Sequence, residues 1–147
     1  MNVTVRPTQA ADYAEVLTLL RQANLPSDGV QEHFANFLVA RDNNDDLVGC
    51  VGWEPYGEIA LLRSLAVCQA ARGKGLGREL VLEVLSVARA KQMREVVLLT
   101  TTAEKFFAGF FGFEKVERGV YDDKLFASLE WHLTQCASAV CMRLPLA

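Results

Sequence analysis

A glycine-rich, basic turn precedes the strongest helical pattern in the chain. From this turn onward, apolar residues recur at helical spacing as far as Ala88. The glycines stand at alternate positions: Gly73, Gly75 and Gly77. Glycine adopts backbone conformations closed to other residues and lets a ligand approach exposed N–H groups. The turn also brings three basic residues together: Arg72, Lys74 and Arg78. Since a helix N-terminus adds unpaired N–H donors, the turn suits a pyrophosphate.

The spacing of this turn excludes two familiar phosphate-binding loops. A Walker loop needs Ser or Thr directly after its Gly-Lys pair, but Gly75 follows Lys74. A dinucleotide-binding fingerprint that begins at Gly75 needs glycine or alanine where Leu80 stands. An ordinary solvated surface turn has a similar composition and remains the alternative interpretation.

Hydrophobic periodicity and turn residues predict a mixed α/β domain. The strands expected span 2–6, 37–41, 47–53, 58–68, 95–100, 113–117 and 137–144. The helices expected are one that Thr8 caps, a short one over 30–36, a long one over 75–92, one over 103–110 and one around 122–133. A strand, a helix and a strand in succession from residue 95 imply a parallel crossover. With no linker or repeat, residues 1–147 are expected to form one domain.

Composition and charge exclude several classes of protein. The chain has 147 residues, 51% of them hydrophobic, which is enough for one core, and a net charge of −3, which argues against nucleic acid as the partner. No apolar run reaches the length of a membrane span, and the first residues lack the features of a signal peptide, so we expect a cytoplasmic protein without a membrane partner.

The cysteines and histidines do not indicate a metal site. The four cysteines form no C-x-x-C pair and are expected to be mostly buried, reduced thiols: Cys50, Cys68, Cys136 and Cys141. His33 and His132 stand alone, without the spacing of metal ligands. The phenylalanines between 106 and 113 recur at helical spacing and are interpreted as core.

The segment 72–77 fits the R/Q-x-x-G-x-G/A motif of the GNAT acetyltransferase superfamily. The preceding segment 63–67 is similar to the fourth strand of that family, and the order of elements from Val3 to Leu144 resembles its layout, with Gly112–Phe113 before a late strand. The resemblance implies a GNAT fold, with a single central mixed sheet of about seven strands that is flanked by helices and splayed between its fourth and fifth strands. It also implies acetyl-coenzyme A as co-substrate.

The resemblance assigns the cofactor contacts residue by residue. It places pyrophosphate against Arg72, Gly73, Lys74, Gly75, Gly77 and Arg78, and pantetheine along the main chain of Leu65, Ala66 and Val67. The implied reaction is direct attack of an amine on the thioester, with a main-chain N–H on the fourth strand, at Leu65, stabilising the oxyanion. Many members carry a tyrosine general acid on the helix that here reads EKFFAGF, without tyrosine. Cys141 and Tyr121 are the replacements considered.

Three further segments narrow the expected substrate. Leu98–Thr101, followed by Phe106–Phe107, resembles the acetyltransferase domain of N-acetylglutamate synthases. The segments 61–67, 98–103 and 137–142 are similar to the ArsN-type acetyltransferases associated with arsenic-resistance operons. Both resemblances imply a small-molecule amine, either a small amino acid or a glutamate-like analogue such as arsinothricin or phosphinothricin.

Several side chains near the fourth strand are candidates for the acceptor site. Arg63 interrupts an apolar strand, and it either binds a substrate carboxylate, pairs with a protein acid or lies on the solvated face. Glu54 and Glu58 are candidates for the general base. The hydroxyls of Thr100 and Thr101 are candidates for substrate contacts, whereas Thr102 is expected to cap the next helix.

Two other functions remain open from the sequence. The first is acetylation of a protein or peptide amine, which calls for an open acidic groove instead of a small pocket. The second is a non-catalytic acetyl-coenzyme A binder, which the missing tyrosine favours. Homodimer formation is also plausible, since many GNAT proteins associate.

Overall fold

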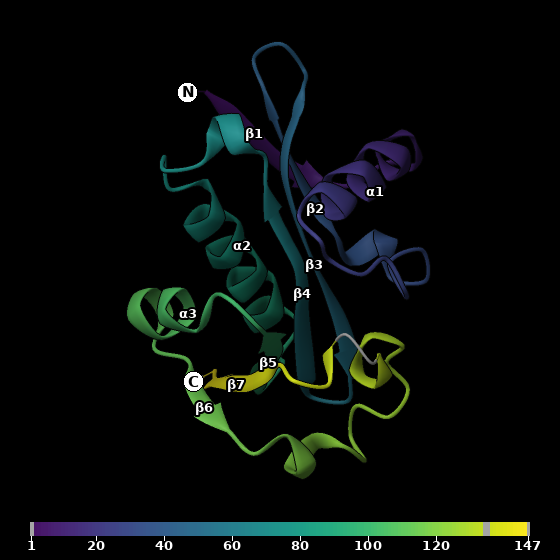
Figure 1. The fold of residues 1–147 in the computed structure, drawn as a ribbon, viewed down its shortest axis with the longest axis vertical. Coiled ribbons are helices and arrows are strands. Elements are labelled where there is room, and N and C mark those ends of the chain that lie inside the picture. The colour runs from purple at the N-terminus through teal and green to yellow at the C-terminus, as the bar shows by residue number, and fades with distance from the viewer. Residues whose placement is uncertain (1, 134–135, 147) are drawn as a thin grey trace.

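The computed structural model describes residues 2–133 and 136–146, which form a seven-stranded mixed sheet with helices on both faces (Figure 1). The strands are β1 (Val3–Pro7), β2 (Leu38–Asp42), β3 (Leu47–Tyr56), β4 (Ile59–Val67), β5 (Glu95–Thr100), β6 (Glu114–Val116) and β7 (Val140–Pro145). They lie in the order β1-β2-β3-β4-β5-β7-β6. The predicted mixed sheet flanked by helices is confirmed.

The α-helices cover opposite faces of the sheet because neighbouring residues of each strand point to opposite sides. The helices are α1 (Tyr13–Gln22), α2 (Leu76–Ala90) and α3 (Glu104–Phe111). Cys50 of β3 packs into the core under α1, whereas the next residue, Val51, packs into the core under α2 and α3. Figure 1 shows α1 and α2 on the two sides of the sheet. Among the described residues, no helix has both the length and the apolar composition needed to cross a membrane.

The sheet contains one parallel pair of neighbouring strands, β4 and β5, and its other neighbouring pairs are antiparallel. Strands β1 to β4 pair antiparallel in succession, and α2 then carries the chain across to β5, which pairs parallel with β4. Strand β7 pairs antiparallel with both β5 and β6 and lies between them. The predicted β5-α3-β6 crossover is therefore parallel, but its two strands are not neighbours.

Strands β4 and β5 separate halfway along their length. Their pairing runs from Ile59 opposite Glu95 to Leu62 opposite Leu98 and goes no further. Just beyond this point, Ser64 has a φ of 60° and the register between β3 and β4 shifts. An extra residue of this kind bends a strand and strengthens its twist. The predicted splay between the fourth and fifth strands is confirmed.

Two predicted helices are wrong, and the predicted cap of α1 is also wrong. The segment 30–36 has only the 3₁₀ turn η2 (Phe34–Asn36), and the segment 122–133 holds no α-helix but is bounded by the 3₁₀ turns η4 (Arg118–Tyr121) and η5 (Glu130–His132). Hydrogen bonds from side chains, instead of the backbone bonds of a helix, stabilise the segment 122–133. Arg118 donates to the carbonyl oxygens of Trp131 and Cys136. Thr8 does not cap α1, because its hydroxyl donates to the Phe34 carbonyl oxygen.

A buried carboxylate, Asp12, joins the start of α1 to the sheet. It accepts the backbone N–H of Gln9 at 2.7 Å, two hydrogen bonds from Arg6 at 2.8 and 3.0 Å, and one from Arg41 at 2.7 Å. Its residue is 2% exposed. The Arg6 guanidinium, together with Arg41 and the Gln9 N–H, holds the pKa of Asp12 well below its ordinary range.

We predict that Asp12→Asn lowers the free energy of unfolding by about 3 kcal/mol at pH 7, because Arg41 loses a buried anionic partner. The depressed pKa means that this stability is present above the unfolded pKa of Asp12 and declines as the pH falls below it. Urea denaturation at pH 7 and pH 3 measures both effects, and the difference between the variant and the wild type should shrink at pH 3. The exposed Asp46 provides the control Asp46→Asn, and an equal loss in both variants would contradict the assignment.

Candidate active site

The turn before α2 has the geometry of an anion-binding loop. Gly73 and Gly75 have φ values of 79° and 82°, in the left-handed region that favours glycine. A Cβ atom added to either would meet no described atom within 4 Å, so the space over the loop is open. Helix α2 begins at Leu76, directly after Gly75, so its first backbone N–H groups, which have no partner within the helix, lie beside the loop.

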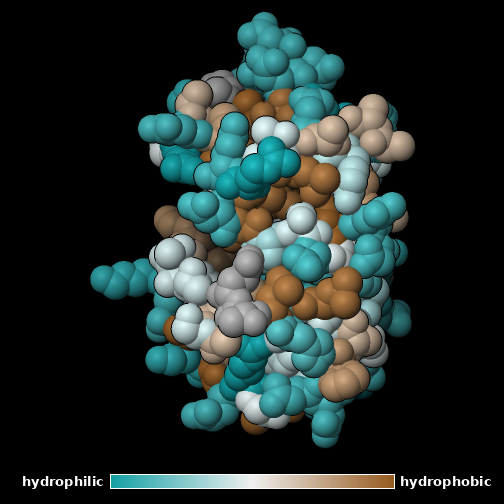
Figure 2. All heavy atoms as spheres, turned by 45° about the vertical axis from the view of Figure 1, so that its right-hand side comes forward, coloured by the Kyte–Doolittle hydropathy of each residue, from teal (hydrophilic) through white to brown (hydrophobic). Residues whose placement is uncertain are grey.

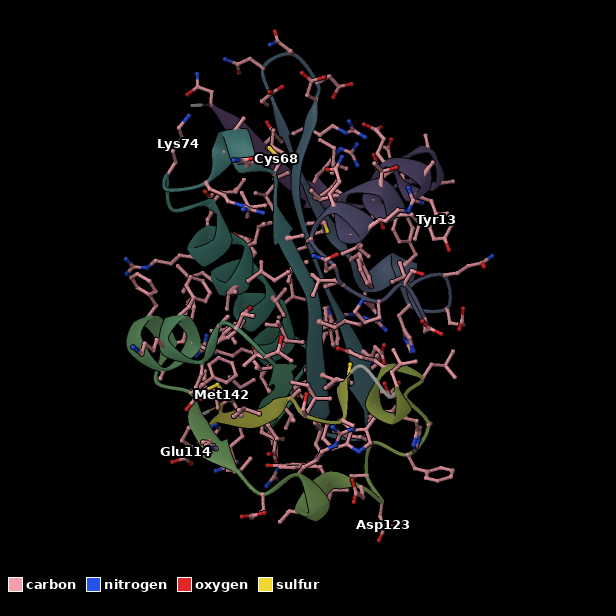
Figure 3. All side chains as sticks on the ribbon, viewed as in Figure 1. Tyr13, Cys68, Lys74, Glu114, Asp123 and Met142 are labelled. Carbon is pink, nitrogen blue, oxygen red and sulfur yellow. The ribbon has the colours of Figure 1, made fainter. Side chains whose placement is uncertain are left out.

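The basic residues of this loop lie at the surface around the start of α2. Lys74 is exposed and extends away from the protein (Figure 3). Arg72 donates from Nε to the Val67 carbonyl oxygen at 3.1 Å, which ties the loop to the end of β4. The guanidinium of Arg78 lies over the Phe110 ring, 5.1 Å from its centroid, and links α2 to α3. The loop therefore joins positive charge, open N–H groups and the end of β4.

The separation of β4 and β5 leaves a passage through the sheet, which we call the inner cleft. This cavity of about 120 Å³ is bordered by Leu62–Leu65 of β4 and by Leu98–Thr100 of β5. Phe107 of α3 lines it on one face of the sheet, and Pro26 and Glu130 line it on the other. A cavity that crosses the sheet allows two molecules to meet from opposite faces.

A larger cavity, which we call the outer cavity, lies on the α1 face and continues the inner cleft. Its volume is about 610 Å³, and it shares Pro26, Thr100 and Glu130 with the inner cleft. Its wall also contains Arg21 at the end of α1 and Asp28 in the following loop. On this side of the molecule, apolar side chains are interspersed with polar ones (Figure 2). The volume is that of a small-molecule site.

Arg63 is buried and bound to protein groups on the α1 face. Its residue is 3% exposed, and Nη1 donates to Glu54 at 2.7 Å and to the Asp28 carbonyl oxygen at 2.6 Å. Nη2 donates to the Pro26 carbonyl oxygen at 3.2 Å, and Nε donates to Ser64 Oγ at 3.0 Å. Of the alternatives left open by the sequence, pairing with a protein acid is the one that the structure shows.

The two carboxylates predicted as general bases lie outside both cavities. Glu54 is fully buried in β3, where Arg63 and the Tyr56 hydroxyl donate to its two oxygens. Glu58 precedes β4 at the end remote from the cleft, is 63% exposed, and pairs with Arg94. About seven residues of extended chain, or roughly 23 Å, separate Glu58 from Leu65. The structure thus corrects the assignment of Glu58, because the residue lies where the strands still pair.

A carboxylate that sequence reasoning missed, Glu130, lines both cavities. It belongs to η5, is 6% exposed, and its Oε2 lies 3.5 Å from Arg63 Nε. Burial, with Glu54 nearby, raises the pKa of Glu130 to about 7, although Arg63 and Arg118 oppose this shift. The available signal was an isolated acid between two apolar residues, Leu129 and Trp131.

The remaining candidates fall into three groups. Thr100 and Thr101 line the outer cavity, and Thr100 Oγ1 accepts the Ala103 N–H at 2.9 Å, just before α3. The predicted cap from Thr102 is wrong, because the N-cap residue of α3 is Ala103 and no side chain caps the helix. Tyr121 and Cys141 are buried in a core away from both cavities. The phenylalanines predicted as core are buried at Phe107 and Phe113, but the prediction is wrong for Phe110, which is 55% exposed. Within residues 2–133 and 136–146, no cluster of metal-ligating side chains occurs.

The chain belongs to the acetyltransferase (GNAT) family, whose model matches residues 6–113. The family uses acetyl-coenzyme A as its acetyl donor. An uncharacterized N-acetyltransferase of Chlorobaculum tepidum, CT2212, is 32% identical over 102 residues, which are 67% of this chain and 62% of that relative. The match thus spans less than two thirds of the relative's length.

Two solved structures share the fold. N-acetylglutamate synthase from Neisseria gonorrhoeae, complexed with coenzyme A and N-acetyl-glutamate, has a TM-score of 0.81 at 16% identity; the match covers 100% of this chain and 36% of that one. Rv2747 from Mycobacterium tuberculosis, in complex with coenzyme A and a second ligand, has a TM-score of 0.78 at 23% identity and covers 98% of this chain and 99% of that one. The ArsN-type resemblance stays a prediction.

We predict that Lys74→Ala weakens coenzyme A binding about tenfold, the effect of losing one charge-assisted contact of about 1.5 kcal/mol. Isothermal titration calorimetry with coenzyme A measures the change. The matched control is Lys91→Ala, since Lys91 is also exposed but follows the opposite end of α2. Equal affinity in the two variants would contradict a pyrophosphate role for the loop.

Proposed function

We propose that the protein transfers an acetyl group from acetyl-coenzyme A to the amine of a small amino acid or glutamate-like analogue, by direct attack in a ternary complex. The observation that carries the proposal is the inner cleft, where β4 and β5 separate and open into a cavity of small-molecule size, on the strand that leads to the glycine-rich loop. The similarity of the fold to an N-acetylglutamate synthase structure supports the choice of substrate.

The donor half of the proposal uses the loop before α2 and the end of β4. Pyrophosphate would lie against Arg72–Gly77 and the first N–H groups of α2, with Arg78 beside them. The pantetheine arm would follow the main chain of Leu65, Ala66 and Val67, which lies beyond the last residue paired with β5. The Leu65 N–H would stabilise the oxyanion, since it follows the irregular Ser64 at the border of the inner cleft.

The acceptor half uses the polar wall of the outer cavity. Its lining includes one guanidinium, Arg21, the hydroxyls of Thr100 and Thr101, and the acids Asp28 and Glu130. An amino acid carries both charges that this wall complements. We place its carboxylate near Arg21, which takes the role that the sequence suggested for Arg63, and its amine near Glu130. A second carboxylate in the substrate would lie near the hydroxyls of Thr100 and Thr101.

The reaction itself needs two things from the protein. It must hold the amine close to the thioester carbonyl carbon, which the junction of the cleft and the cavity provides. It must also stabilise the negative charge that develops on the carbonyl oxygen, which a main-chain N–H on β4 provides. The C–N bond forms first, the C–S bond then breaks, and coenzyme A leaves as a thiol.

We predict amine-dependent release of coenzyme A thiol with glutamate or its analogues arsinothricin and phosphinothricin, and slower release with lysine peptides. Thiol titration across this panel and other free amino acids measures the release. Turnover confined to peptides would identify a peptide acetyltransferase instead, and binding of acetyl-coenzyme A without turnover of any amine would contradict the enzymatic proposal.

For an accepted amino acid, Arg21→Ala should raise the KM for that acceptor about tenfold or more and leave the KM for acetyl-coenzyme A unchanged, because the side chain lies in the outer cavity only. Steady-state kinetics with each substrate varied separates the two constants. Arg89→Ala, an exposed position in the last turn of α2, serves as the control. An equal rise in both KM values would argue against a carboxylate contact.

A further inference from the structure

We propose that Glu130 is the general base that removes a proton from the ammonium group of the acceptor, an inference that rests on the proposed acetyl transfer. No residue on β3 or β4 is available for this role among the described residues of the two cavities. Glu130 comes from η5, on the opposite side of the cleft from the loop before α2.

The first support is position. Glu130 lines the inner cleft, where the thioester would lie, and the outer cavity, where the amine would enter. Asp28 also lines the outer cavity but does not border the inner cleft, and it is exposed. Glu54 borders neither. Glu130 is thus the carboxylate at the junction of the two cavities, as a base must be if it acts on the attacking amine.

The second support is an unfilled hydrogen-bonding position. Glu130 Oε2 is buried and accepts no hydrogen bond from the described residues. Its nearest cationic atom, Arg63 Nε, stands 3.5 Å away and donates to Ser64 Oγ instead. A buried carboxylate oxygen without a donor is costly, and an ammonium N–H is the donor that would complete it.

The third support is the charge balance on this face of the sheet. One buried guanidinium, Arg63, lies between two buried carboxylates, Glu54 at 2.7 Å and Glu130 at 3.5 Å. Glu54 accepts hydrogen bonds from the guanidinium and from the Tyr56 hydroxyl, so Glu130 shares with Glu54 a cation that is already hydrogen-bonded. An acceptor ammonium would supply the missing positive charge, and transfer of its proton would leave Glu130 neutral.

The carboxylate is held in place by the loop around it. The neighbouring Trp131 donates its indole N–H to Asp122 at 2.9 Å and lies under the Arg118 guanidinium, 4.6 Å from the ring centroid. Arg118 also donates to the carbonyl oxygens of Trp131 and Cys136. These contacts fix the backbone directly after Glu130, so its side chain enters the cleft from an anchored segment.

The acceptor nitrogen loses two protons during the transfer. Glu130 takes one proton from the R–NH₃⁺ group, and the neutral nitrogen attacks the thioester carbonyl carbon to form the C–N bond. The C–S bond then breaks, and the second proton lost by the nitrogen goes to the departing thiolate, which yields coenzyme A thiol and the amide. Glu130 returns its proton to water through the outer cavity.

The charged surroundings of Glu130 support a base that works near neutral pH. Burial raises its pKa to about 7, in a range suited to accepting a proton from an ammonium group. The titratable and charged groups that face it come from five places: Arg63 on β4, Glu54 on β3, Arg118 on η4, Cys136 after η5, and Arg21 and Asp28 across the outer cavity. Below this pKa the protonated carboxyl is unable to accept a proton.

The test is the pH profile of Glu130→Gln, measured with any amine that the wild type acetylates. We expect wild-type kcat/KM to fall as the pH drops through about 7, and we expect the variant to lose about 100-fold or more at pH 8 and to lack the limb at about pH 7. Glu83→Gln, an exposed glutamate on α2, is the matched control. Wild-type activity or an unchanged acidic limb in Glu130→Gln would overturn the proposal.

A stability measurement separates catalysis from structure. Because the folded pKa of Glu130 lies above its unfolded value, its contribution to stability declines as the pH rises from about 4.5 to about 7. Glu130→Gln should therefore be at least as stable as the wild type at pH 8, with unchanged coenzyme A affinity. A variant that is inactive because it is unfolded or fails to bind coenzyme A would instead assign Glu130 a structural role.

If the wild type acetylates no amine in the panel, the proposed function fails and Glu130 is tested by itself. Infrared difference spectra of the wild type against Glu130→Gln, recorded from pH 4 to pH 9, report its carboxyl group directly. A protonated C=O band that disappears between about pH 6 and 8 fits a base held ready in an empty acceptor site. A band already lost below pH 5 would overturn the proposal.

Discussion

The parallel pairing of β4 and β5 ends at Leu62 and Leu98, and the active-site geometry depends on that early end. Had the two strands paired along their full length, the sheet would be closed and nothing would pass between its faces. Ser64, with its positive φ, turns the second half of β4 away from β5. The gap exposes main-chain groups of β4 to a ligand, and α2 begins with its N-terminus beside the end of that strand. The bend at Ser64 thus opens the gap in which donor and acceptor are proposed to meet.

Electrostatics on the α1 face complements this geometry. Arg63 stands beside the gap, yet the protein itself occupies its guanidinium through Glu54 and two main-chain carbonyl oxygens. Burying an arginine in this way fixes the 26–28 loop against β4 and forms one wall of the inner cleft. It also leaves Glu130 as a second acid beside a cation that is already paired. In the proposed mechanism, this arrangement favours a positively charged acceptor beside Glu130.

The sequence predicted the parts of the molecule that local patterns determine. The loop 72–77 and the long helix after it were predictable because glycine spacing, basic residues and helical periodicity all fall within one short stretch. The predicted helix around 122–133 was wrong because Trp131 and Arg118 hold that segment through side-chain contacts, which have no period in the sequence. Glu130 was missed with it.

The roles of Arg63, Glu54 and Glu58 depended on which face of the sheet each one meets. Alternation along a strand gives two faces but does not say what covers them, and the partner of Arg63 comes from residues nine positions and more away in the chain. Glu58 lies close to β4 in sequence but at the wrong end of it. Glu130 lies far from Leu65 in the sequence, and only the fold places it beside the gap that Leu65 borders.

We propose that donor and acceptor meet in the gap between β4 and β5. A crystal structure of the protein with coenzyme A and N-acetyl-L-glutamate would locate both. We expect the coenzyme A sulfur in the inner cleft beside Leu65, and the amide nitrogen of the acetylated compound facing the Glu130 carboxylate. A sulfur atom outside the gap, or an amide nitrogen turned away from Glu130, would contradict it.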